Sequence, residues 1–223
     1  YGHEAGETDT VAGLFDAVAL PLHYDGRIET LDEWLGWFSD EELARYPALA
    51  VYGAWIRALT GRPEEAVRWL ALADGATSAL PLSDGSATIE PWVDTLRAHM
   101  MKDGVEQALT VADRALDQLP SESIWIPVTL VARGAAHALL GATDRATDDL
   151  TAVIERAEAF GAVEESYVAH AQLALVAVGQ GAWGEAARHA QAAELIVEEG
   201  GLGDYSTSAL VSAATARVAL HEG

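Results

Sequence analysis

Apolar residues recur at helical spacing along most of this 223-residue chain, and no stretch alternates as a half-buried strand does. Five glycines interrupt the pattern, each closing one helical stretch and opening another: Gly26, Gly61, Gly104, Gly141 and Gly181. Their spacings are 35, 43, 37 and 40 residues. Two helices within a period of this length are typical of tetratricopeptide-like arrays, in which loop insertions account for the longer intervals.

The residues around these glycines explain how two helices are joined. A glycine adopts the left-handed backbone conformation at little steric cost, so it ends a helix readily. Leu31 follows the first glycine by five positions, and an alanine stands four or five positions after each of the others: Ala66, Ala108, Ala146 and Ala186. Because alanine is small, the two helix backbones can approach closely, and each segment therefore predicts a helical hairpin.

We therefore predict an all-α fold, a right-handed solenoid of antiparallel, tetratricopeptide-like helix pairs that forms one domain over residues 1–223, with about five hairpins. The hairpins are expected near residues 10–38, 47–74, 90–118, 124–159 and 164–199, and a final helix near 205–221. Pro63 suits the first turn of a helix, and Ser39 with Glu42 forms a capping box for a short helix at 40–46.

The net charge of the chain excludes some classes of binding partner. Thirty-five acidic residues against thirteen basic ones give a net charge of −22. Such a surface repels phosphate backbones and anionic lipids, so we expect no direct binding to nucleic acid or to a membrane. The longest apolar stretch, residues 124–141, is interrupted by Arg133 and His137. The absence of cysteine excludes disulfides and thiolate chemistry and fits a cytoplasmic location.

Sequence motifs for catalysis are missing. The chain has no phosphate-binding GxxxxGK[ST] loop, no HExxH and no GxSxG elbow. Its seven histidines are scattered singly, and its paired acids fall on helix starts or polar faces. We therefore expect a non-catalytic chain without a cofactor or metal in this segment. An all-α enzyme is the third alternative, and metal-dependent turnover lost on mutating His137 and His170 together would support it.

Polar residues on the first helices of the hairpins are candidates for a binding groove, since these helices line the concave side of tetratricopeptide-like stacks. Thr129, Arg133 and His137 recur every four residues and so share one helix face. The other polar candidates lie on the preceding and following first helices: Arg97, Tyr167 and His170. A groove with these residues favours an anionic or amphipathic ligand. The alternative is that they only bond neighbouring helices, with each arginine balanced by an acid.

The tryptophans pose the same choice. Trp55 and Trp92 are on first helices, where they would form the floor of a groove or pack in the core. Trp34 and Trp37, spaced i, i+3, are expected to pack between hairpins, and Trp69 is expected in the core of the next pair.

Three stretches carry a family resemblance: YDGRIETLDEWLGWFSDEELARYPALAVYGAWIRALTGRPEEAVRWLALA (24–73), DGSATIEPWVDTLRAHMMKDGVEQALTVADRAL (84–116) and DYSTSALVSAATARVAL (204–220). They resemble the helical-repeat region of large actinobacterial LuxR-type, maltose-regulator-like transcriptional regulators. These regulators begin with an ATPase module and end with a DNA-binding helix-turn-helix. The WLGWF, RYPALAV and DGSA segments are more specific than a generic repeat consensus.

The resemblance implies the central sensor and oligomerisation region of such a regulator. In that role the chain would receive a small-molecule inducer or a protein partner and control self-association. No catalytic residue of the family maps onto the chain. The alternative is a free-standing tetratricopeptide-like scaffold that binds a protein segment in its concave groove.

Overall fold

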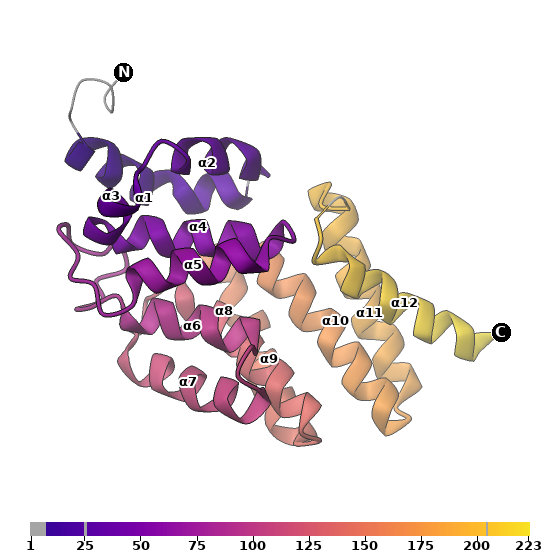
Figure 1. Ribbon diagram of the computed structural model, residues 1–223. Coiled ribbons are helices and arrows are strands. Elements are labelled where there is room, and N and C mark those ends of the chain that lie inside the picture. The colour runs from indigo at the N-terminus through magenta and orange to yellow at the C-terminus, as the bar shows by residue number, and fades with distance from the viewer. Residues whose placement is uncertain (1–7, 25, 204) are drawn as a thin grey trace. The chain divides into compact units, whose positions relative to one another are not determined.

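The chain is all-α. The computed structural model describes residues 8–24, 26–203 and 205–223, and it contains no β-strand in these ranges (Figure 1). The helices are α1 Thr8–Tyr24, α2 Ile28–Leu35, α3 Asp40–Arg45, α4 Pro47–Leu59, α5 Pro63–Ala73, α6 Glu90–Met100, α7 Val105–Gln118, α8 Trp125–Leu139, α9 Thr143–Phe160, α10 Val163–Gln180, α11 Trp183–Gly200 and α12 Ser208–Glu222. The all-helical prediction is confirmed, although the last helix begins at Ser208 rather than at residue 205.

Packing divides the chain into two compact units. Unit 1 comprises residues 1–100 and 114–123, and unit 2 comprises residues 101–113 and 124–223. Helix α7 contributes residues to both units. Each unit is described separately below.

The five predicted glycines all have positive φ, between 72° and 96°, so the expected left-handed conformation is confirmed. Gly141 shows what this conformation does. Its N–H donates to Ala138, and the next N–H, of Ala142, donates to the carbonyl of His137 at 2.9 Å. Gly181 and the residue after it repeat both bonds. These bonds satisfy carbonyls at the end of the first helix before the second helix begins.

In unit 1, α4 packs against α1, α2, α5 and α6. Gly53 of α4 lies against the ring of Trp69, and a Cβ added there would come within 2.0 Å of a ring carbon. Trp69 is buried as predicted, whereas Trp37 is 47% exposed and does not pack as predicted. Trp37 contacts Trp34 near the end of α2, with 6.2 Å between the ring centroids.

Local capping in unit 1 agrees with the sequence. The side chain of Ser39 accepts from the N–H of Glu42, and Glu42 accepts from the N–H of Ser39 at 2.8 Å. Pro63 occupies the first turn of α5. These contacts confirm the predicted capping box and the first-turn proline.

The carboxylate of Asp84 organises the loop between α5 and α6. It accepts hydrogen bonds from the backbone N–H and hydroxyl of Ser86, from the indole of Trp92 and from the hydroxyl of Ser123. The loop and the start of α6 are therefore held together by one acceptor.

In unit 2, neighbouring helices pack in sequence order: α8 with α9, α9 with α10, α10 with α11, and α12 with both α10 and α11 (Figure 1). Ala146 and Ala186, four residues into α9 and α11, are fully buried. On α8, a Cβ added at Gly134 would meet Leu150 of α9 at 2.8 Å. Small residues thus permit close helix contact at the two predicted alanines and also at Gly134, which was not predicted, and α10 packs against α9, α11 and α12.

Candidate functional site

The two candidate tryptophans occupy different environments in unit 1. Trp92 is completely buried and donates to Asp84 at 3.0 Å, so it belongs to the core around the α5–α6 loop. Trp55 is half-buried on α4, and its ring centroid lies 5.3 Å from that of His23 on α1.

Arg97 takes part in an ion-pair network of α5, α6 and the part of α7 in unit 1. Its guanidinium contacts Asp74 at 2.8 Å and Asp94 at 3.6 Å. Asp94 is only 2% exposed and accepts two hydrogen bonds from Arg114, at 2.5 and 2.6 Å. A buried carboxylate held by two bonds from one guanidinium is a strong pairing geometry. Arg97 and Arg114 therefore join α6 to the helices before and after it.

The stripe of Thr129, Arg133 and His137 is tied to neighbouring helices of unit 2. The guanidinium of Arg133 makes two bonds to Asp149 of α9, at 2.9 and 2.6 Å, and a third to Asp113 of α7, at 2.9 Å. His137 Nε2 lies 3.9 Å from Asp149. Burial acts to lower the pKa of Arg133, but the bonds to both carboxylates outweigh it and raise that pKa. The fully buried Thr129 donates to the carbonyl oxygen of Trp125 at 2.7 Å.

Tyr167 and His170 are likewise engaged within unit 2. Tyr167 is fully buried, and its hydroxyl donates at 2.6 Å to Thr207, which donates to Glu164. Burial raises the pKa of Tyr167 far above its ordinary value. The Nδ1 atom of His170 on α10 lies 2.9 Å from Nδ1 of His189 on α11. Because one Nδ1 must donate to the other, at least one ring of this pair is neutral.

Sequence reasoning did not identify Arg57, which makes the corresponding linkage in α4. Its guanidinium lies 3.2 Å from Asp32 of α2, 3.4 Å from Glu65 of α5, and over the ring of Trp69 at 3.6 Å. Burial lowers the pKa of Arg57, and the charge of Asp32 opposes that effect. Its position could have identified it as a candidate, because Arg57 precedes Gly61 by four residues, as the candidate His137 precedes Gly141.

Helices α4, α6 and α8 thus share one arrangement. Each bears one or two charged residues that pair with an earlier and a later segment of the chain: Arg57 with Asp32 and Glu65, Arg97 and Asp94 with Asp74 and Arg114, Arg133 with Asp113 and Asp149.

Helix α10 departs from this arrangement. Leu173 stands eight residues before Gly181, where α8 has Arg133 eight residues before Gly141. Ala177 likewise takes the place of His137, and on the second helix of the pair His189 takes the place of Asp149. Apolar side chains therefore replace the linking cation of α8.

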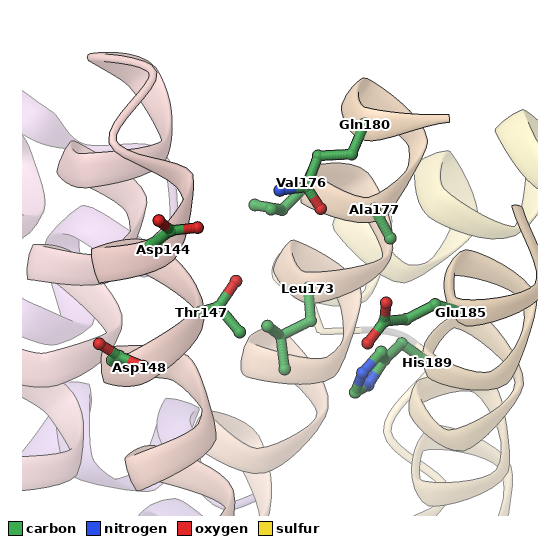
Figure 2. Close-up of a pocket in the computed structure, with 9 residues that line it drawn as sticks. All are labelled: Asp144, Thr147, Asp148, Leu173, Val176, Ala177, Gln180, Glu185 and His189. Carbon is green, nitrogen blue, oxygen red and sulfur yellow. The ribbon is translucent and has the colours of Figure 1, made fainter. Parts of the chain in front are cut away.

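A pocket of about 370 Å³ lies over this part of α10, between α9 and α11 (Figure 2). Its floor on α10 is mainly apolar, and its walls are polar. The lining residues are Asp144, Thr147 and Asp148 from α9, Leu173, Val176, Ala177 and Gln180 from α10, and Glu185 and His189 from α11. None of the eight residues predicted for the groove lines this pocket, although His170 touches it indirectly through His189. We call it the α10 pocket.

The charge in the α10 pocket is negative. Asp144 and Asp148 line one wall and Glu185 the other, and the lining contains neither lysine nor arginine (Figure 2). Glu185 is approached at 3.6 Å by the exposed Arg188 of its own helix. Burial lowers the pKa of His189, as does the charge of Arg188, so its imidazole is neutral at pH 7. The negative charge of the aspartates is thus not offset by a cation in the wall.

Within the described ranges, no cluster of three histidine, cysteine or acidic side chains has the geometry to hold a metal ion. In the same part of the chain, no helix is both long enough and apolar enough to cross a bilayer. No protein-family model, no curated protein and no solved structure matches this chain.

Proposed function

We propose that this chain is a non-catalytic, ligand-sensing domain, and that the α10 pocket receives the ligand. The observation that carries this proposal is the replacement of the linking cation of α8 by Leu173 and Ala177 in α10. On α8 the equivalent position carries Arg133, which is paired with Asp149, whereas on α10 it carries Leu173, which lines a pocket. Its size lies within the range of small-molecule sites, which bury an apolar body and orient it with a few polar groups.

We also propose that the helices form a tetratricopeptide-like solenoid and that the chain belongs to a LuxR-type transcriptional regulator. A tetratricopeptide-like stack is supported by the glycines of positive φ at repeat junctions and by the fully buried alanines Ala146 and Ala186. The resemblance to LuxR-type regulators supports a sensing and self-association region. The coding sequence on either side tests that assignment, which requires an ATPase module before this chain and a helix-turn-helix after it.

Filling the pocket tests the binding function. Val176 is a half-buried residue of the lining, so Val176→Trp should occupy the space while keeping an apolar surface. A ligand that binds only the folded state raises its melting temperature. We expect compounds from a library of cationic, neutral and anionic metabolites to raise the melting temperature of the wild type and not that of Val176→Trp.

Ala213→Trp is the matched control, because Ala213 is exposed on α12 and does not line the pocket. This variant should keep the ligand response of the wild type. If no compound stabilises the wild type more than Val176→Trp, the α10 pocket is not a ligand site.

A further inference from the structure

The walls of the α10 pocket hold more negative charge than the protein itself neutralises. Asp144 and Asp148 are four residues apart on α9, so their side chains share one face of that helix. Neither makes an ion pair with a basic residue in the described part of the chain. Two adjacent carboxylates without a counter-charge repel each other, and a cation between them relieves that repulsion.

The preceding helix pair shows which group is missing. There Asp113 of α7 and Asp149 of α9 face each other across α8, and the guanidinium of Arg133 lies between them. In the next pair the acids of α9 and Glu185 of α11 face each other across Leu173, which has no charge (Figure 2). At α10, Leu173 stands in place of the cation and His189 in place of Asp149, while three acids at other positions, Asp144, Asp148 and Glu185, line the two walls.

The floor of the pocket determines what must accompany the cation. Leu173, Val176 and Ala177 present hydrocarbon to the space between the walls. A bare inorganic cation gains nothing from this surface. An alkyl chain gains about 25 cal/mol for each Å² of apolar surface removed from water. The floor and walls together therefore suit a positive head group on an apolar body.

The surroundings favour a small molecule over a peptide. An extended peptide needs an open path past the pocket, but on the α8 side of α9 the corresponding space is filled by Arg133 with Asp113 and Asp149. A free amine needs only the pocket itself.

We propose that the α10 pocket binds a small organic cation, an ammonium or guanidinium group on a short alkyl chain, held between Asp144 and Asp148 of α9 and Glu185 of α11 over an apolar floor. This inference rests on the function proposed above and adds the chemical class of the ligand.

Three probes with the same six-carbon chain separate charge from hydrophobicity: hexylamine, hexan-1-ol and hexanoate. Binding is followed by amide NMR shifts of residues in α9–α11. We expect hexylamine to bind with a dissociation constant of about 1 mM, which is typical for so few atoms. Hexan-1-ol should bind at least about fivefold more weakly because it lacks the ion pairs. Hexanoate should give no saturable shift.

Two double variants with the same loss of charge locate the effect. Asp144→Asn with Asp148→Asn should weaken hexylamine binding about tenfold, because two partly screened ion pairs worth about threefold each are lost. Glu194→Gln with Glu198→Gln removes two exposed carboxylates of α11 outside the lining and should leave binding unchanged. Equal weakening in both variants would show a general effect of net charge and would overturn the inference.

Leu173→Arg supplies the cation from within the chain. An arginine at this position places a guanidinium on the floor of the pocket, between the acids of the two walls, so the variant should lose hexylamine binding. Leu173→Met, which keeps the apolar floor, should retain binding. If Leu173→Arg does not fold, the asparagine variants still decide the question.

The remaining outcomes are also decisive. Stronger binding of hexan-1-ol or hexanoate, lost in Val176→Trp, would leave the pocket a ligand site and refute the cationic ligand. Tighter binding of the peptide acetyl-Ala-Ala-Lys-Ala-Ala-amide than of hexylamine would replace the small molecule by a protein segment. If neither the three probes nor the metabolite library binds, both the inference and the proposed function fail.

Discussion

Replacing Arg133 by alanine tests whether the polar stripe of α8 holds the helices of unit 2 together. The substitution removes three hydrogen bonds at once, two to Asp149 and one to Asp113. The side chain of Asp149 is only 9% exposed, so its carboxylate would be left without its main partner in a poorly solvated place. Asp113 is 62% exposed and would return to water at little cost.

The magnitude follows from these exposures. Breaking a fully buried ion pair by removing one partner costs about 3–5 kcal/mol. Arg133 is 24% exposed, so water screens part of the interaction and can solvate Asp149 after the change. We therefore expect Arg133→Ala to lower the free energy of unfolding by about 2 kcal/mol, a value between a surface pair and a buried one.

Urea unfolding followed by circular dichroism at 222 nm measures this loss. Arg145→Ala is the matched control, because Arg145 is an exposed arginine of α9 and has no ion pair in the described part of the chain. It should change the unfolding free energy by less than about 0.5 kcal/mol. Arg133→Met combined with Asp149→Leu removes both charges and should recover most of the loss, since no charge is left buried alone.

A loss below about 0.5 kcal/mol for Arg133→Ala would refute the reasoning, because the value would equal that of an exposed residue. The expected loss would identify the stripe as structural. That result would leave the α10 pocket, and not Arg133 and His137, as the place to look for a ligand.

Three further predictions concern particular sites. Gly53→Ala should lower the unfolding free energy by about 2 kcal/mol, because the new Cβ would meet the ring of Trp69. Gly179→Ala should raise it by up to about 1 kcal/mol, because the space around Gly179 is open. Equal changes of the two variants in thermal unfolding would contradict this reasoning. Burial lowers the pKa of His170 from 6.5 to about 4, so its stabilising contribution is complete above pH 6.5 and is lost as the pH falls toward 4. The melting temperature of the wild type should therefore fall faster between pH 7 and pH 5 than that of His170→Gln, and parallel curves would refute the claim. Asp84→Ala should lower the unfolding free energy by about 2–3 kcal/mol, because four donors in and around the loop lose their acceptor. A loss no larger than that from replacing an exposed carboxylate of unit 1 by alanine would show that other contacts hold the loop.

Local features of this protein could be derived from the sequence because they depend on residues close together in the chain. Helical periodicity gave the all-α class, and glycine marked the junctions because few other residues adopt positive φ without strain. The capping box of Ser39 and Glu42 and the burial of Ala146 and Ala186 follow from residue type and position within one or two turns. Each of these expectations is confirmed by the structure.

The partners of polar side chains could not be derived in this way. Whether Arg133 points at a ligand or at Asp113 and Asp149 depends on how α7, α8 and α9 are aligned along one another. Trp37 was expected to pack between hairpins, yet it is 47% exposed. Helix α2 ends at Leu35, so Trp37 lies beyond the helix on which its i, i+3 spacing from Trp34 would place both rings on one face.

The α10 pocket combines a feature that can be read from the sequence with one that depends on helix packing. That Leu173 precedes Gly181 by the same eight residues as Arg133 precedes Gly141 can be read from the sequence, and equal distance from the glycine that ends a helix gives residues equal positions on their helices. The pocket over Leu173, with Asp144 and Asp148 on one side and Glu185 on the other, is visible only in the folded chain. The reason is physical: a cavity is formed by side chains from three helices at once, and their separation is set by packing rather than by the period of any one of them.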